Sequence, residues 1–287
     1  MAQSPTHRLG QIIGDLLEES ARPLLESVAQ RHGVYLDFRH ERPARNGRST
    51  VSWVDSMGNS HRLDYVIEQG GSEDNMGRPR AFIETAWRRY TKHSRNKAQE
   101  IQGAVLALAE TYRDCRPFLG VILAGVFTDG SLQQLRSNGF RIVYLPYEKV
   151  LEAFRVAGIN AAFDEDTRDE VVQGKVDAYE RLTQEQRAGV CEALRAAERG
   201  QLDAFVRDLC GVLGRAVETV YVTTLHGQTE QLRTPQDAIA FLKDYQEAAA
   251  SLPFVRYELG VRFTNGDEVR ATFRDKAQAI EFLRGMR

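Results

Sequence analysis

The segments Arg62-Leu-Asp64-Tyr-Val-Ile-Glu68 and Ala81-Phe-Ile-Glu84-Thr-Ala-Trp87, which a polar loop separates, decide the fold of the first half of this chain. Each is a short, mostly apolar run bounded by glycine or polar residues, a pattern typical of a strand. An acid inside such a run is costly to bury unless it is paired or has a function. Because neighbouring strands lie about 5 Å apart, Asp64 and Glu84 are predicted to converge at one edge of a hairpin.

Strands and helices alternate outward from these two segments. The preceding residues predict a helix over 8–31, which Pro23 is expected to kink or split. A second helix is predicted over 95–112, with Ser94 as its N-cap. The remaining expected elements are strands over 34–38, 50–54, 118–127 and 140–145 and helices over 131–138 and 147–156. The alternation in the second part favours parallel strands and an α/β fold.

The chain beyond residue 158 has a different character. Residues 159–215 are charged and periodic, which predicts a helical connector. Residues 216–287 contain an internal repeat, and each copy reads as strand, turn, strand and a helix that ends in Ala-Ile-x-Phe-Leu. His226-Gly227 and Asn265-Gly266 are the expected turns. We therefore expect a core over 1–158, a connector over 159–215 and a small α+β domain over 216–287.

Composition limits the classes of protein to which the chain can belong. Hydrophobic residues make up 42% of the 287 residues, which is ordinary for a globular protein. Apolar runs are too short for a spanning helix, and the first residues lack the pattern of a secretory signal. The three cysteines are widely spaced, as in a protein of a reducing compartment. We expect a cytoplasmic protein without membrane contact.

Positive charge is concentrated locally although the formal net charge is −2. Seven Arg and Lys residues against one acid lie between Arg78 and Lys97, and a second group contains Arg39, Arg42, Arg45 and Arg48. Such patches are typical of a protein that contacts a polyanion on one face. The candidate DNA-binding residues are Arg80, Arg88, Arg89, Lys92, His93 and Arg95.

The order of elements over residues 8–156 resembles the core of the PD-(D/E)XK restriction-endonuclease superfamily. The shared features are a helix, a hairpin that carries Asp64, a strand that carries Glu84, a helix and an apolar strand. The resemblance implies a mixed sheet flanked by helices, and Asp64 and Glu84 as ligands of Mg²⁺, for which Mn²⁺ is a substitute. It also implies hydrolysis of DNA phosphodiester bonds, and cleavage of both strands of a duplex favours a homodimer.

The sequence departs from that family at Ala86, where the family has a lysine that orients or activates the attacking water. Lys97 is the candidate substitute, because it falls within about 40° of Ile101 on the second helix at 100° per residue. Some members of the superfamily add an acid from the first helix, and Glu19 is the candidate for that role.

Three interpretations remain open. The first is a restriction-type, Mg²⁺-dependent DNA endonuclease. The second is a catalytically impaired protein with a nuclease fold that binds DNA or acts as a scaffold in a defence system, which Ala86 favours. The third is a protein-interaction module that acts through its C-terminal repeats. Salt-dependent DNA binding distinguishes the first two from the third.

Overall fold

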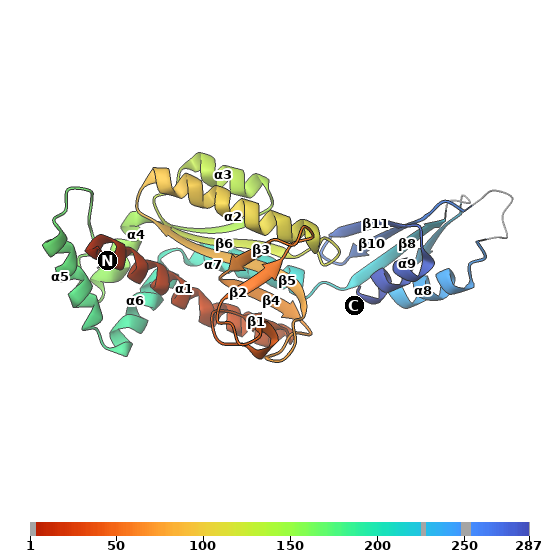
Figure 1. The fold of residues 1–287 in the computed structure, drawn as a ribbon, viewed down its shortest axis with the longest axis horizontal. Helices are drawn as coiled ribbons and strands as arrows, with labels where there is room; N and C mark the ends of the chain where they lie inside the picture. Colours follow the sequence, from red (N-terminus) through yellow and green to blue (C-terminus); the bar gives the residue numbers. More distant parts are fainter. Residues whose placement is uncertain (1–3, 225–227, 248–253, 287) are drawn as a thin grey trace. The chain divides into compact units, whose positions relative to one another are not determined.

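The chain forms two compact units in the computed structural model, which describes residues 4–224, 228–247 and 254–286 (Figure 1). The first unit comprises Met1–Thr111 and Pro117–Cys210, and the second comprises Tyr112–Arg116 and Gly211–Arg287. This division differs from the expected boundaries at 158 and 215, since most of the expected connector belongs to the first unit. No helix within the described ranges has the length and apolar character that a bilayer crossing requires.

A mixed five-stranded sheet with strand order β1-β4-β5-β6-β7 organises the first unit. Its strands are β1 (Tyr35–Asp37), β4 (Tyr65–Gln69), β5 (Arg78–Arg88), β6 (Phe118–Gly125) and β7 (Arg141–Pro146). The pairs β1–β4 and β4–β5 are antiparallel, whereas β5–β6 and β6–β7 are parallel. β6 is buried along most of its length, as its apolar run predicts. The α/β class and the mixed sheet are therefore confirmed.

A separate two-stranded hairpin precedes β4. It consists of β2 (Val51–Val54) and β3 (Ser60–Leu63), and its turn is held by Asp55. The Asp55 carboxylate accepts hydrogen bonds from the backbone of Met57 and Asn59 and contacts His61 Nε2 at 2.8 Å. The expected single strand over 62–67 is thus interrupted at Asp64, which lies between two different sheets.

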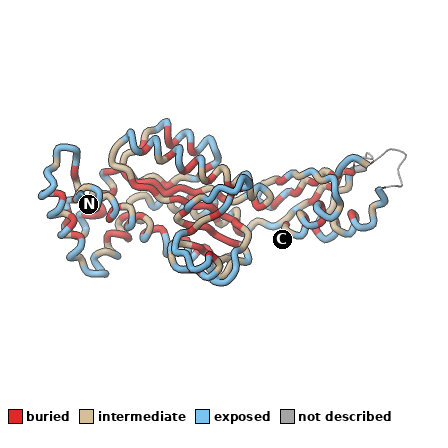
Figure 2. The backbone as a smooth tube through the Cα atoms, viewed as in Figure 1, coloured by how far each residue is buried: buried red, intermediate tan, exposed pale blue. Residues whose placement is uncertain are grey.

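Helices cover both sides of the mixed sheet (Figure 1). α1 (Pro5–His32), α2 (Thr91–Thr111), α3 (Asp129–Ser137) and α4 (Tyr147–Arg155) contact its strands, whereas α5 (Asp169–Glu180) and α6 (Gln184–Ala197) pack on α1. α2 packs with α3 on one side, while α1 packs with α5 and α6 on the other. α1 is one continuous helix through Pro23, so the expected split is absent. Buried residues follow the strands and the inward faces of these helices (Figure 2).

Most of the expected connector, as far as Cys210, belongs to the first unit, because α5 and α6 pack on α1 and the helix α7 (Arg199–Leu213) contacts β6. The rings of Phe118 and Phe205 meet edge to face with centroids 5.0 Å apart. A Cβ atom at Gly120 would lie 2.6 Å from the Phe205 ring, so only glycine allows this close approach. Thr183 is the N-cap of α6 and forms a capping box with Gln186.

The second unit contains the internal repeat as two strand-strand-helix copies. Its elements are β8 (Val217–Thr224), β9 (Gln228–Leu232), α8 (Pro235–Asp244), β10 (Tyr257–Phe263), β11 (Glu268–Phe273) and α9 (Lys276–Arg284). The strands form one antiparallel sheet of order β11-β10-β8-β9, and both helices bury apolar residues in its core. Gly266 has φ of 86°, as the expected Asn265-Gly266 turn requires. The expected turn His226-Gly227 lies outside the described residues.

Candidate active site

The antiparallel register of β4 and β5 brings Asp64 and Glu84 together. Tyr65 pairs with Ile83, so Asp64, one residue before β4, lies opposite Glu84. The Asp64 backbone N–H donates to Glu84 Oε1 at 3.2 Å. The Thr85 backbone N–H and hydroxyl donate to Asp64 Oδ2 at 2.7 and 2.9 Å. The two carboxylates therefore share one corner of the sheet, where the chain passes from the hairpin into β4.

Burial sets the electrostatics of this corner. Glu84 is 6% exposed, and burial, followed by the charge of Asp64, raises its pKa well above the ordinary value. Burial also raises the pKa of Asp64, while the hydrogen bonds from Thr85 and the charge of Lys97 oppose that rise. Two acids in a low-dielectric corner repel each other, so the site favours the uptake of positive charge.

Lys97 reaches this corner from α2. Its Nζ lies 4.0 Å from Glu84 Oε2 and 2.8 Å from Glu100 Oε1. α2 begins at Thr91, earlier than predicted, and Ser94 lies inside the helix with its hydroxyl donating to the Thr91 carbonyl. Ser94 is therefore not the N-cap. The longer helix places Lys97 in its second turn, close to the buried face that faces the sheet.

The first helix contributes Glu18 to this corner and not Glu19. Glu18 is half-buried, and its backbone carbonyl accepts a 2.7 Å hydrogen bond from the Tyr65 hydroxyl beside Asp64. Burial and the charge of Asp64 raise the pKa of Glu18 to about 7. Glu19 is exposed; its charge raises the pKa of Tyr179 and Cys191 and makes a minor contribution to the raised pKa of Glu18. Of the two neighbouring acids, Glu18 and not the expected Glu19 has its pKa raised by Asp64. The apolar stripe of α1 contacts both the sheet and α5–α6, so the sequence did not show which acid faces β4.

Half of the candidate DNA-binding residues make internal contacts. Arg80 is buried and donates to Gln69 Oε1 at 2.8 Å. Arg89 donates to the Phe163 carbonyl, and its guanidinium lies 4.0 Å from the ring centroid of Tyr147. Arg88 is half-buried and donates to the adjacent Trp87 carbonyl. Arg80 and Arg89 therefore stabilise the fold in this structure, contrary to the sequence expectation that they contact phosphates.

The other three candidates remain accessible. Lys92, His93 and Arg95 are exposed in the first turns of α2, ahead of Lys97 on the same helix. His93 contacts the Tyr90 ring edge to face with centroids 6.5 Å apart. Positive charge at a helix start, where backbone N–H groups are free, suits a phosphate. These residues form the accessible remainder of the first basic group.

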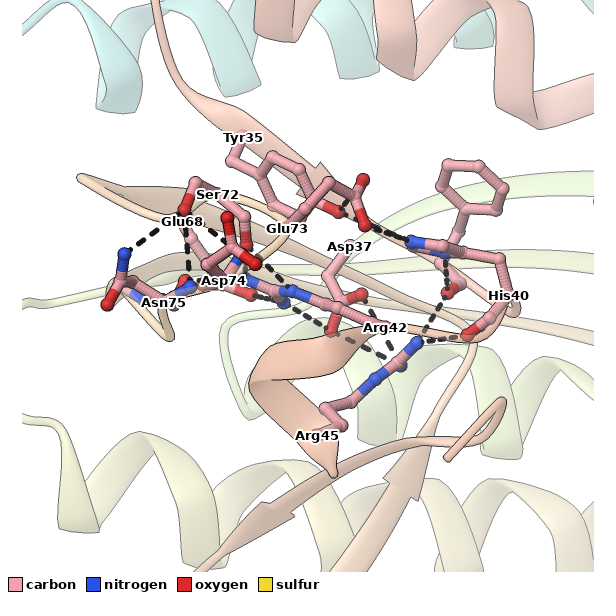
Figure 3. A network of polar contacts seen from close by, with 12 residues as sticks. Tyr35, Asp37, His40, Arg42, Arg45, Glu68, Ser72, Glu73, Asp74 and Asn75 are labelled. Carbon is pink, nitrogen blue, oxygen red and sulfur yellow. Dashed lines mark hydrogen bonds and ion pairs between the residues drawn. The ribbon is translucent and has the colours of Figure 1, made fainter. Parts of the chain in front are cut away.

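Two arginines of the second basic group, Arg42 and Arg45, belong to a buried ion-pair network, which Figure 3 shows. Arg42 is fully buried and binds both carboxylate oxygens of Glu68, at 2.6 and 3.1 Å. It also lies 2.9 Å from Asp37 Oδ2 and donates to the Ser72 and Asn75 carbonyls. Such bidentate contacts are specific to arginine. This network fastens the loop after β1 to the loop between β4 and β5, and the sequence did not predict it.

The protein ligands available at Asp64 and Glu84 fit Mg²⁺. In the described part of the chain, no cluster of three or more His, Cys, Asp or Glu side chains has the geometry of a metal site. A site that needs three or four protein ligands, as Zn²⁺ does, is therefore not formed by these residues. Mg²⁺ is usually held by one or two carboxylates, with substrate phosphates and water as the other ligands. The two carboxylates, and the repulsion between them, match that requirement.

Comparisons with known proteins do not show a family. No protein-family model matches the chain, and no curated protein matches it. A similar solved structure is described as the crystal structure of a protein of unknown function, AF1548. It shares 11% identity and a TM-score of 0.29, and the match covers 66% of this chain and 98% of that one. A likeness this weak carries no argument, so the function is argued from the site.

Proposed function

We propose that this protein is a Mg²⁺-dependent nuclease that hydrolyses phosphodiester bonds of DNA. The observation that carries the proposal is the pairing of Asp64 with Glu84 across β4 and β5, with Lys97 Nζ 4.0 Å from Glu84. Two desolvated carboxylates beside one amine are expensive to maintain for stability alone. Perturbed acids of this kind concentrate at functional sites.

The proposed roles follow from the contacts of each side chain. Asp64 and Glu84 would hold Mg²⁺, which when bound lowers the pKa of a coordinated water and neutralises charge on the phosphate. Thr85 fixes the Asp64 carboxylate through two hydrogen bonds. Lys97 provides, from α2, the cation that the family has at the position of Ala86. Ala86 lies on the same face of β5 as Glu84, because successive side chains of a strand alternate.

The substrate and its recognition belong to the same proposal. Exposed Lys92, His93 and Arg95 would contact the DNA backbone beside the site, since cations close to a cleavage centre neutralise flanking phosphates. Restriction-type cleavage of duplex DNA would require two sites, which a two-fold homodimer supplies. Measuring cleavage of single-stranded and of duplex DNA tests this substrate preference separately from the metal site.

The central test is Glu84→Gln, which removes one charge and keeps the shape of the side chain. We expect Mg²⁺-dependent cleavage of plasmid and linear DNA by the parent chain, and a loss of at least ~100-fold in Glu84→Gln and Asp64→Asn. Glu19→Gln is the matched control, because Glu19 is an exposed acid on the first helix. Cleavage that survives in Glu84→Gln, or that persists with EDTA, would overturn the assignment.

A second candidate function is that of a catalytically impaired nuclease fold that binds DNA without cutting it. Two observations favour it: Ala86 replaces the family lysine, and Lys97 is paired with Glu100 at 2.8 Å, closer than to Glu84. This candidate predicts salt-dependent DNA binding by the parent chain without cleavage of duplex, single-stranded or methylated DNA in Mg²⁺ or Mn²⁺. Cleavage in any of these conditions decides for the nuclease.

A further inference from the structure

Arg39 is an exposed cation that the fold places at the rim of the Asp64–Glu84 corner. It follows β1, whose Asp37 pairs with Val66 of β4. Arg39 lies two residues after that last pair and Asp64 two residues before it, so both stand near the same end of the β1–β4 ladder. β4 lies between β1 and β5, so the chain that carries Arg39 and the strand that carries Glu84 are its two neighbours.

Electrostatic contacts agree with this position. The charge of Arg39 lowers the pKa of Asp64 and of Glu18 against the larger effect of burial. Among the residues that the structure describes, however, no hydrogen bond or ion pair engages the Arg39 guanidinium. The charge of Arg39 thus interacts with Asp64 and Glu18, while its guanidinium N–H groups remain available to bind a ligand.

The backbone on both sides of Arg39 is held in place. Arg45 is buried, and its Nη2 donates to the carbonyls of Phe38 and His40, the two neighbours of Arg39. Its Nη1 lies 3.3 Å from Asp37 Oδ1. His40 Nδ1 also contacts the Phe38 carbonyl at 2.9 Å. The buried network of Figure 3 therefore fixes the loop. Arg39 itself is exposed.

We propose that Arg39 is a substrate-positioning residue that binds a backbone phosphate of the nucleic acid in the Asp64–Glu84 site. The inference rests on the proposed function, since it names a contact of that same site. A phosphate suits this place because the guanidinium presents several donors in a planar fork that matches two phosphate oxygens. Because the backbone around Arg39 is already held in place, less conformational entropy is lost when the contact forms.

The test measures DNA binding without divalent metal, so that it does not depend on cleavage. Fluorescence anisotropy of a labelled duplex, titrated with the full chain over a range of KCl concentrations in EDTA, gives the affinity and its salt dependence. We expect Arg39→Ala to weaken binding by about 5- to 10-fold and to reduce the slope of log K against log salt by about 1. Arg39→Lys keeps the charge and should keep most of the slope.

Arg48→Ala is the matched control, because Arg48 is an exposed arginine of the same loop whose charge is not among the main causes that shift the pKa of Glu18, Asp64 or Glu84. Arg39→Ala that matches Arg48→Ala in affinity and slope would overturn the inference, and so would a parent chain whose DNA binding does not depend on salt. Failure of the proposed function has a different signature. In that case the Arg39 effect on binding is present, but Mg²⁺-dependent cleavage is absent or survives in Glu84→Gln.

Discussion

The raised pKa of Glu18 predicts how the stability of the protein depends on pH. Its pKa is about 7 in the folded protein, against an ordinary value of 4.5, because it is partly buried beside Asp64. The folded state therefore holds the Glu18 proton more tightly than the unfolded state. The contribution of Glu18 to the free energy of unfolding falls as pH rises from 4.5 to about 7, and it stays at the lower value above pH 7.

The magnitude follows from the two pKa values. A difference of about 2.5 pH units corresponds to ~3.4 kcal/mol at 1.36 kcal/mol per unit. Glu18 is only half-buried, so solvent screening reduces the expected cost to about 1–2 kcal/mol. Glu18→Gln, which stays neutral, should stabilise the metal-free protein by about 1–2 kcal/mol at pH 8 and by less than about 0.5 kcal/mol at pH 5.

Urea unfolding monitored by tryptophan fluorescence measures the stability of the first unit, which contains Glu18. The chain has two tryptophans, Trp53 and Trp87, and both lie in the first unit. The matched control is Glu19→Gln, which alters an exposed acid on the same helix and should change stability by less than about 0.5 kcal/mol at both pH values. A gain in Glu18→Gln that is equal at pH 5 and pH 8, or that Glu19→Gln reproduces, would refute the raised pKa of Glu18.

Three further predictions follow from the same structure. Arg42→Ala leaves buried carboxylates without their partner and should lower the stability of the first unit by about 3–5 kcal/mol in urea, whereas Arg48→Ala should have almost no effect. Lys97→Ala should reduce Mg²⁺-dependent cleavage of plasmid DNA by at least ~10-fold. Adding Ala86→Lys should recover part of this activity, since it places an amine on the face of β5 that carries Glu84. No recovery would show that a lysine at position 86 cannot replace Lys97. Gly120→Ala should destabilise by about 1–3 kcal/mol in thermal unfolding, because the new methyl group meets the phenylalanine ring of α7, and an unchanged melting temperature would contradict that packing.

Local patterns were sufficient to predict most of the elements. The apolar run over 118–127 identified β6, and the repeat identified the two strand-strand-helix copies of the second unit. Asp64 and Glu84 could be singled out because an acid in an apolar strand is conspicuous in sequence. Lys97 could be proposed because helical periodicity places it beside the buried face.

Errors arose where one pattern was compatible with two environments. Glu18 and Glu19 are adjacent on a helix that contacts the sheet on one flank and other helices on another, and periodicity alone does not distinguish the two flanks. The helix that carries Lys97 starts at Thr91, whereas the sequence predicted a start at residue 95. Most of the expected connector belongs to the first unit because its helices pack on segments distant in sequence, α5 and α6 on α1 and Phe205 of α7 on Phe118 of β6.

The sequence by itself determined the order of strands and helices, the repeat, and the two acids that mark the candidate site, because each of these depends on residues close together in the chain. Only the tertiary structure decided which arginines are buried in ion pairs and which face solvent. Arg42 and Arg39 are three residues apart and identical in type, yet one is enclosed by Glu68 and Asp37 while the other is exposed near Asp64. That difference depends on strand pairing between distant segments, which no local pattern encodes.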